Sequence, residues 1–219
     1  MSEYTHRYDE AARAAVYRVI HERRDVRHFL GTPIDSGTLG RILEAAHAAP
    51  SVGLSQPWRF LRISDLELRR EIYQLVQRER TRTADALGSR REEFLRLKVE
   101  GIGECAELLV VALLQGGARE MFGRRTLPQM DLASAACAIQ NLWLAARAEG
   151  LGVGWVSMFD PQALAELLRF PRDAQPIAVL CVGNVPAFDL LPRLTLDQWR
   201  HPRPLSDVLY ENHWPEGAT

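Results

Sequence analysis

The chain has 219 residues, of which 47% are hydrophobic and 25% charged, and its formal net charge at pH 7 is -1. We therefore expect a single globular domain over residues 1–219 and no nucleic-acid partner, because phosphate binding on that scale needs a surplus of positive charge. The N-terminus has no apolar signal segment, and the longest aliphatic run, residues 108–114, is far shorter than the ~20 residues that span a bilayer. We expect a cytoplasmic protein with no membrane partner.

The three cysteines are widely spaced along the chain, at Cys105, Cys137 and Cys181. Their odd number disfavours a disulfide framework, and the absence of Cys-x-x-Cys pairs or histidines at ligand spacing disfavours a zinc site. We expect no metal centre. Because all three lie in apolar stretches, they are interpreted as buried, inert thiols.

Apolar residues at helical spacing predict an amphipathic helix over residues 9–23. Its apolar face consists of Ala12, Ala15, Val16, Val19 and Ile20. A second helix is expected after Asp35-Ser36, up to residue 48, and a strand over residues 58–63. Residues 66–100 are highly charged and predict a long helical excursion with a break near Gly88.

The second half of the chain alternates apolar strands and helices, which indicates a layered α/β or α+β domain. Strands are expected at residues 108–114, 153–159 and 177–182, and helices at residues 131–149 and 161–168. The helix over residues 131–149 is apolar around most of its circumference and is expected to be central. The tail, residues 190–219, either docks on its own core or wraps around a second subunit. Its Arg203 either completes a distant anion site or is an ordinary surface arginine.

The sequence Arg23-Arg24-Asp25-Val26-Arg27 places three guanidinium groups within five residues. Such groups can converge on one phosphate, because each offers a planar fork of donors. Asp25 would be repelled by a bound phosphate, so it either pairs with an arginine or has a chemical task. The local residues alone favour pairing.

Two prolines bracket a loop of small residues at 50–57, which contains Ser51 and Gly53. The loop is either an ordinary connection or a rigid element whose backbone amides approach a ligand. The Gly-Leu-Gly-Val-Gly segment at residues 150–154 follows a helix and precedes a strand. That order is the reverse of a dinucleotide fingerprint, so we exclude a Rossmann site. Ser157 is either a core hydroxyl or a group directed at a ligand.

Together these motifs resemble the nitroreductase-like flavoprotein family. Its Arg-Arg-Ser-x-Arg-x-Phe segment, its Ala-Pro-Ser loop running to Gln-Pro-Trp, its Gly-Leu-Gly segment before a Trp-containing strand and its late Arg-Pro-Leu have counterparts here, in the same order. The resemblance implies an α+β fold with helices around a central, mostly antiparallel sheet. It also implies a homodimer that binds flavin mononucleotide (FMN) at the subunit interface, with the tail wrapped around the partner subunit. The FMN-binding residues implied by the resemblance are Arg23, Arg24, Asp25, Val26, Arg27 and Arg203 around the phosphate and ribityl chain, and Ser51, Gly53 and Ser157 around the ring.

Departures from the family pattern indicate one branch of it. Asp25 replaces the usual serine of the arginine segment, Leu54 replaces the usual asparagine of the loop, and Ser157 follows Gly-Trp-Val. Members of this branch fragment reduced FMN with O2 into 5,6-dimethylbenzimidazole, the lower ligand of vitamin B12, and a four-carbon sugar phosphate. By this resemblance Asp25 would be a catalytic base toward the ribityl carbons, and Ser157 would act near the ring. Residues 66–100 would cover the flavin, and a separate flavin reductase would supply it reduced.

Two alternatives stay open at this point. The first alternative to FMN fragmentation is an NAD(P)H-dependent nitroreductase or flavin reductase with permanently bound flavin. The second is a flavin-binding module without chemistry. Asp25 and Leu54 disfavour the first alternative. A binding module would gain nothing from a carboxylate beside a phosphate.

Overall fold

The computed structural model describes residues 6–114 and 123–215. The start of the N-terminal segment considered above and the end of the predicted tail therefore lie outside the described residues. The chain divides into two compact units, Met1–Phe188 and Asp189–Thr219. That these units make up a single domain stays a prediction. Over the described residues, no helix combines the length and hydrophobicity needed to cross a bilayer.

A four-stranded sheet in the order β1-β2-β4-β3 forms the centre of the first unit. Its strands are β1 (Trp58–Ile63), β2 (Glu107–Leu114), β3 (Gly152–Val156) and β4 (Ala174–Gly183). Each neighbouring pair of strands is antiparallel, which confirms the predicted α+β class and the predicted character of the sheet. The central strand β2 is buried over nearly its whole length, as its continuous apolar run predicts.

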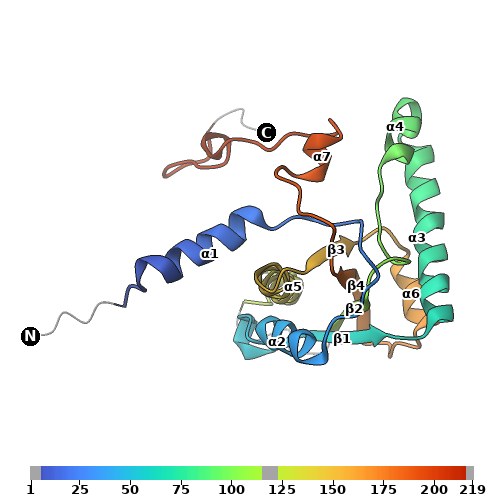
Figure 1. Ribbon diagram of the computed structural model, residues 1–219, viewed down its shortest axis with the longest axis horizontal. Helices are drawn as coiled ribbons and strands as arrows, with labels where there is room; N and C mark the ends of the chain where they lie inside the picture. The colour runs from blue at the N-terminus through green and yellow to red at the C-terminus, as the bar shows by residue number, and fades with distance from the viewer. Residues whose placement is uncertain (1–5, 115–122, 216–219) are drawn as a thin grey trace, which may run out of the picture. The chain divides into compact units, whose positions relative to one another are not determined.

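Helices cover both faces of this sheet (Figure 1). The first unit contains α1 (Glu10–Glu22), α2 (Ser36–His47), α3 (Leu66–Ala86), α4 (Arg91–Arg96), α5 (Met130–Ala148) and α6 (Pro161–Leu167). Successive residues of a strand point to opposite faces, so β2 contributes to two separate cores. Leu109 packs with Ile42 of α2 and Leu142 of α5, whereas Leu108 packs with Ile72 of α3.

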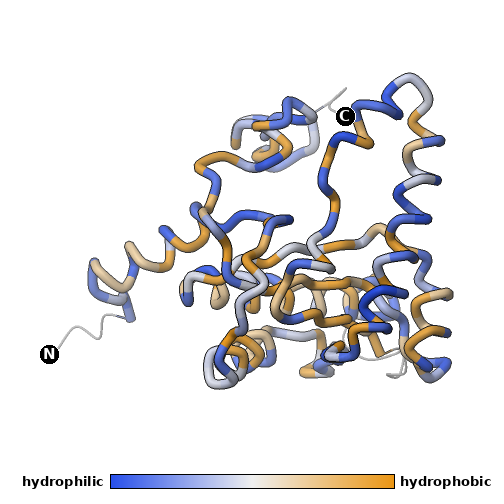
Figure 2. The backbone as a smooth tube through the Cα atoms, turned by 45° about the vertical axis from the view of Figure 1, so that its right-hand side comes forward, coloured by the Kyte–Doolittle hydropathy of each residue, from blue (hydrophilic) through white to orange (hydrophobic). Residues whose placement is uncertain are grey.

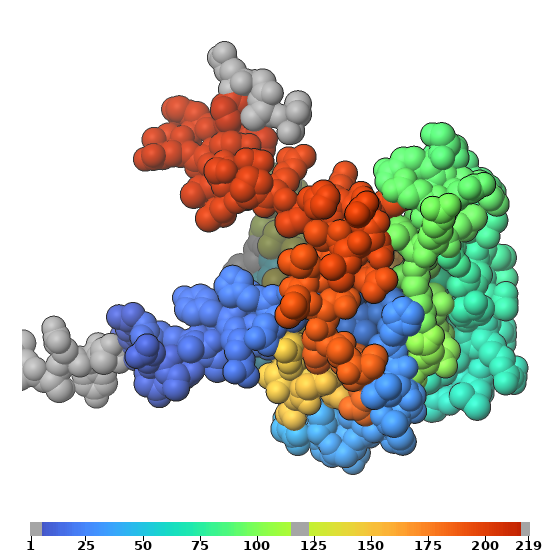
Figure 3. All heavy atoms as spheres, turned by 45° about the horizontal axis from the view of Figure 1, so that its top comes forward, coloured from blue at the N-terminus to red at the C-terminus, as the bar shows by residue number. Residues whose placement is uncertain are grey.

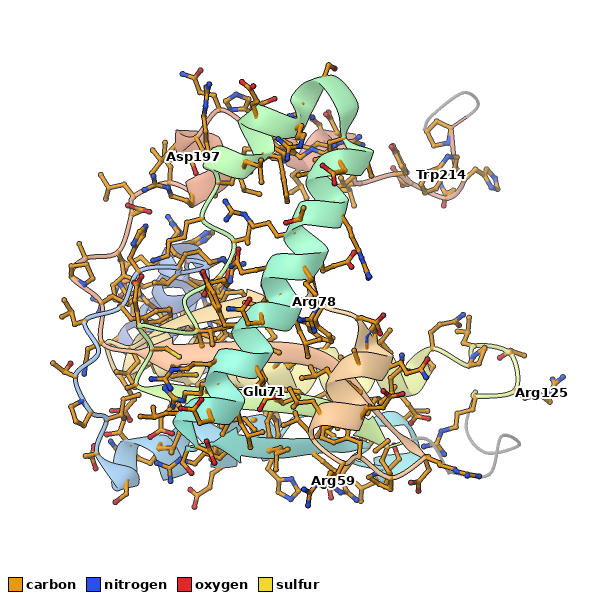
Figure 4. All side chains as sticks on the ribbon, turned by 90° about the vertical axis from the view of Figure 1, so that its right-hand side faces the viewer. Arg59, Glu71, Arg78, Arg125, Asp197 and Trp214 are labelled. Carbon is orange, nitrogen blue, oxygen red and sulfur yellow. The ribbon has the colours of Figure 1, made fainter. Side chains whose placement is uncertain are left out.

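The charged excursion at residues 66–100 is a helical hairpin broken where the sequence predicts it. Helix α3 ends at Ala86, and Gly88 adopts a φ of 55°, which favours glycine. The Arg80 side chain ties α3 to the end of α4 by donating to the carbonyl oxygens of Leu95 and Leu97, at 2.5 and 3.0 Å. The second half of α3 and α4 extend beyond the sheet (Figures 1 and 4) and form a continuous surface ridge, drawn in green in Figure 3.

Helix α1 forms as predicted, with the Asp9 side chain accepting from the amide of Ala12 at 2.8 Å. Its apolar face, however, is not buried. Val16, Tyr17 and Ile20 are 50%, 63% and 44% exposed, and hydrophobic stretches are visible along the helix in Figure 2. The apolar pattern therefore predicts the helix correctly, but no described part of the chain buries that face.

Helix α5 lies in the main hydrophobic core, as its apolar sequence predicts, but part of its surface is exposed. Its buried residues, which include Ala135, Ala138 and Leu142, lie toward the sheet and α2. Leu132 is 46% exposed and Cys137 is exposed, because both project away from that packed face. The prediction that all three thiols are buried is thus wrong for Cys137 alone.

The strand expected over residues 153–159 is shorter than predicted. Its pairing with β4 ends at Val156, opposite Val179, and Ser157 is the first residue beyond the strand. The chain leaves the sheet there because Asp160 soon begins α6, its carboxylate accepting from the amides of Gln162 and Ala163. Ser157 is exposed and is therefore not a core hydroxyl.

The second unit is built from short elements. It contains α7 (Arg193–Leu196) and a 3-10 turn, η3 (Leu205–Asp207). The rings of Tyr210 and Trp214 meet edge to face, with centroids 5.0 Å apart. Arg203 lies between the two elements and is exposed.

Candidate functional site

The arginine segment, residues 23–27, is fastened to β3 by backbone contacts. The amide of Val26 donates to the carbonyl of Val153 at 3.0 Å, and Asp25 forms an isolated parallel bridge with Val153. A Cβ atom on Gly154 would lie 2.2 Å from the carbonyl oxygen of Val26. Glycine at position 154 therefore permits the close approach of the two backbones, a role unrelated to a dinucleotide fingerprint.

The Asp25 carboxylate is held from two sides. One oxygen, Oδ1, accepts from the backbone amide of Trp155 at 3.0 Å, and the other, Oδ2, accepts from Nη2 of Arg27 at 2.5 Å. The same Nη2 donates to the Trp155 carbonyl oxygen at 2.9 Å. Pairing of Asp25 with an arginine, which the residues alone favour, is thus confirmed, and the partner is Arg27.

Burial against β3 raises the pKa of the Asp25 carboxyl above its ordinary value. The charge of Arg27, the amide of Trp155 and the charge of Arg23 all oppose this shift, but they do not cancel it. The side chain is 43% exposed, so solvent still reaches part of it and limits the shift. A carboxylate whose basicity is raised while it stays accessible has the properties of a general base.

The three arginines of the segment have different environments. Arg23 lies over the ring of Trp143, with Cζ 4.6 Å from the ring centroid. Arg24 donates through Nη1 to the carbonyl oxygens of His21 and Arg23, both at 2.7 Å, where α1 ends. The indole of Trp143 donates to the Arg24 carbonyl oxygen at 3.0 Å. Nη1 of Arg24 is thus engaged by the backbone, and the convergence of the three guanidinium groups on one phosphate stays a prediction.

The site contains buried donors suited to an anionic group. Nε of Arg23 and Nη1 of Arg27 are buried and have no hydrogen-bond partner among the described residues. A buried donor without an acceptor is costly. Nη1 of Arg27 lies against Gly154, so Nε of Arg23 is the donor of this pair that fits an acceptor-rich ligand such as a phosphate ester. The residues present thus fit FMN, with Arg23 as the donor for its phosphate that the geometry supports best.

The serine loop, residues 51–56, is held at the start of α5. The amide of Val52 donates to Oγ of Ser134 at 3.1 Å, and the Ser51 hydroxyl accepts from the amide of Gln56 at 3.0 Å. Gly53, Leu54 and Gln56 have positive φ angles of 54°, 53° and 42°. Backbone in this region is strained for residues other than glycine and persists only where the surroundings impose it.

A partly buried ion pair secures the same loop. Arg124 donates to both carboxylate oxygens of Asp131, at 2.9 and 2.7 Å, and the two side chains are only 11% and 18% exposed. The hydroxyl of Ser55 also donates to Asp131, at 3.3 Å. Two side chains from the first turns of α5, Asp131 and Ser134, therefore fix a loop with three left-handed residues.

The expected site residues fall into separate groups. Arg23, Asp25, Val26 and Arg27 lie together against β3, and Ser157 follows that strand closely. Ser51 and Gly53 belong to the serine loop at the other end of α5, since Ser134 and Trp143 lie about 13 Å apart along the helix axis. Arg203 belongs to the second unit.

Sequence reasoning assigned no role in the site to four residues that support these groups, namely Trp143, Trp155, Asp131 and Ser134. A tryptophan inside an alanine-rich helix is a signal that could have identified Trp143. Trp155 acts through its backbone, which no side-chain motif reveals. Polar residues on the first turns of an otherwise apolar helix, directed at a strained loop, could have identified Asp131 and Ser134.

The chain is similar to known proteins over most of its length. The nitroreductase family model matches residues 20–184. A 5,6-dimethylbenzimidazole synthase of Rhodospirillum rubrum is 40% identical over 90% of this chain and 94% of that protein. One from Rhodobacter capsulatus is 38% identical over 90% of this chain and 96% of that protein. Among solved structures, an iodotyrosine deiodinase bound to FMN and 3-iodo-L-tyrosine matches 91% of this chain and 99% of that one, with a TM-score of 0.71 and 23% identity.

Proposed function

The chain belongs to the nitroreductase family, and from this premise we propose that it converts reduced FMN and O2 into 5,6-dimethylbenzimidazole. The second product is erythrose 4-phosphate. Similarity to 5,6-dimethylbenzimidazole synthases at 38–40% identity over 90% of the chain supports this activity. The structural observation that carries it is Asp25, a carboxylate of raised pKa inside an arginine segment.

Asp25 is proposed as the catalytic base. Reduced FMN, when bound, supplies a ring that reacts with O2 and a ribityl chain whose carbons must lose protons. The Trp155 amide and Arg27 fix the orientation of the carboxylate, and its burial increases its affinity for a proton. A base positioned in this way typically contributes ~10²–10⁴-fold to the rate.

The remaining contacts with FMN follow from the two groups of residues. Arg23 would bind the phosphate through Nε, which is buried and has no hydrogen-bond partner among the described residues. Val26 would contact FMN from the same segment. Ser51 and Gly53 would present the strained serine loop to the ring, and Ser157 would donate a hydrogen bond beside it. Arg203 would complete the phosphate site only in the arrangement that the second unit adopts in the working enzyme.

We further propose that the enzyme is a homodimer with FMN at the interface. Val16, Tyr17 and Ile20 of α1 and Leu132 of α5 are apolar side chains left exposed in the single chain, and a second copy would cover them. The tail would wrap around that copy. Sedimentation should give a dimer for the native chain and a shift toward monomer for Ile20→Lys. A monomeric native chain would refute the dimer.

The ridge formed by α3 and α4 is proposed to cover bound flavin, and a separate flavin reductase is proposed to reduce it. Covering the site would keep water away from the reacting ring. The chain should then oxidise NADH slowly on its own, and product formation should rise when a flavin reductase is added.

The decisive experiment supplies the purified protein with chemically reduced FMN in air. 5,6-Dimethylbenzimidazole above an enzyme-free control, detected by chromatography and mass, is the expected result. Rapid oxidation of nicotinamide without this product would identify a nitroreductase or flavin reductase instead. FMN that is bound, reduced and reoxidised without loss would identify a flavin-binding module.

A further inference from the structure

Arg27 is an expected phosphate ligand, yet its side chain is committed elsewhere. Nη2 bridges the Asp25 carboxylate at 2.5 Å and the Trp155 carbonyl at 2.9 Å. The side chain is only 15% exposed. A donor that already serves two acceptors has little capacity for a third, so Nη2 is not free to bind a phosphate.

The other terminal nitrogen of Arg27 lies against the sheet. Nη1 is buried, and a Cβ atom on Gly154 would lie 2.9 Å from it. The guanidinium therefore rests on the bare Cα of Gly154. The absence of a side chain at Gly154 therefore makes room for the Arg27 guanidinium as well as for the Val26 carbonyl oxygen.

Arg23 differs from Arg27 on each of these points. It lies over Trp143, it makes no hydrogen bond to Asp25, and it leaves Nε buried and without a partner among the described residues. Its charge acts on Asp25 only through space. Two arginines of one short segment are thus arranged for different tasks.

We propose that Arg27 is the positioning residue of Asp25, and that it acts on the reaction through this carboxylate rather than by holding the phosphate of FMN. Its Nη2 donates both to Asp25 Oδ2 and to the carbonyl oxygen of Trp155, and the amide of Trp155 donates to Oδ1, so both carboxylate oxygens are held beside the same residue of β3. The groups that face the carboxylate are Arg27, Arg23 and the Trp155 amide. The catalytic part of this inference rests on the proposed function.

The test compares Arg27→Gln with the matched variant Arg23→Gln. In the ligand-free protein, carbon-13 NMR of the aspartate carboxyls follows the titration of Asp25, whose signal is assigned by its loss in Asp25→Asn. Arg27→Gln should raise the pKa of Asp25 further, because a hydrogen bond and a close positive charge are lost together. Arg23→Gln should raise it less, because only a more distant charge is removed.

A second readout separates positioning from phosphate binding. Riboflavin lacks the phosphate of FMN, so the ratio of their affinities, measured with the oxidised flavins by fluorescence quenching, reports the phosphate contact. Arg27→Gln should keep this ratio within about twofold, whereas Arg23→Gln should lower it roughly tenfold, the equivalent of 1.4 kcal/mol. Product formation by Arg27→Gln at pH 7 should fall roughly 10- to 100-fold, and its acid limb should move to higher pH.

Loss of the preference for FMN in Arg27→Gln, with the Asp25 titration unchanged, would overturn the proposal. Should Arg27→Gln not fold, Arg27→Met removes the same charge and hydrogen-bond donors while keeping an unbranched side chain, and the same two outcomes apply to it. Failure of the proposed function is a different result. In that case the native protein forms no 5,6-dimethylbenzimidazole, yet the Asp25 titration still responds to Arg27.

Discussion

The arginine segment and the serine loop are both expected to contact the flavin, but they are held in place by different means. The arginine segment is bound to β3 by a backbone hydrogen bond, and this places a carboxylate beside the sheet where it is partly removed from solvent. The serine loop is held by side chains of α5, and its cost is backbone strain at Leu54 and Gln56. The destabilising feature of the arginine segment is thus a carboxylate of raised pKa, whereas that of the serine loop is a strained backbone that fixes the shape of the loop.

Removing the carboxylate gives the largest expected effect. Asp25→Asn keeps the shape of the side chain but not its basicity, so product formation should fall by ~10²–10⁴-fold. FMN affinity should change little. Glu149→Gln is the matched control, because Glu149 is also paired with an arginine, Arg41, at 2.8 and 3.0 Å, but lies outside the site. Product formation by Asp25→Asn at the native rate would remove the case for base catalysis.

The second largest expected effect is a loss of folding stability when the arginine segment is pushed away from β3. Gly154→Ala places a methyl group 2.2 Å from the Val26 carbonyl oxygen, and overpacking of this kind typically costs about 1–3 kcal/mol. Gly40→Ala in α2 meets no atom within 4 Å and should instead stabilise by about 0.5–1 kcal/mol. Urea denaturation measures both changes. Equal effects of the two substitutions would show that the close approach at Gly154 is unimportant.

Releasing the serine loop should weaken binding more than chemistry. Ser134→Ala leaves the Val52 amide without its acceptor, a loss of about 1–3 kcal/mol, and allows the strained turn to relax. FMN affinity should fall up to roughly tenfold, whereas turnover at saturating FMN should stay within about threefold. Thr126→Ala is the control, because its hydroxyl also donates to a backbone carbonyl, that of Gly123, but holds no loop. A loss of turnover without a loss of FMN affinity would contradict the prediction that the serine loop serves binding.

The smallest expected effect is the pH dependence of stability. Because the folded-state pKa of Asp25 is raised, ionisation of this group disfavours the fold above its unfolded pKa, and the penalty disappears as pH falls through the folded pKa. Asp25→Asn should therefore raise Tm at pH 7 by at most a few degrees, and the gain should vanish in acid. Asp35→Ala should do the opposite, because hydrogen bonds from Thr38 lower the pKa of that helix cap. Calorimetry across pH distinguishes the two signs.

The sequence predicts the elements of this fold well because apolar periodicity determines them locally. The break at Gly88 is confirmed, and the antiparallel sheet confirms what the family resemblance implies. Strand β3 ends before Ser157, and the cap at Asp160 begins the next helix. The exposed face of α1 could not be anticipated, since the pattern shows that a face is apolar but not what covers it.

The sequence indicates which residues belong to the candidate site better than it indicates which of their atoms are in contact. Asp25 stands out because its charge is unfavourable beside a phosphate, and its pairing with Arg27 is the interpretation that the residues favour. Which guanidinium nitrogen meets which oxygen depends on β3, more than a hundred positions along the chain. The support of the serine loop by Ser134 depends on a tertiary contact of the same kind, which local sequence does not encode.

The contacts of Asp25 and Arg27 with Trp155 also occupy backbone groups at the outer edge of β3. β3 is the last strand of the sheet, and the outward amide and carbonyl of Trp155 would otherwise be open to pairing with a strand of another molecule. Asp25 occupies the amide and Arg27 the carbonyl, while Val26 takes the carbonyl of Val153. We therefore expect the Asp25–Arg27 pair to hinder unspecific strand pairing at this edge, and variants that remove the pair should be less soluble at high concentration.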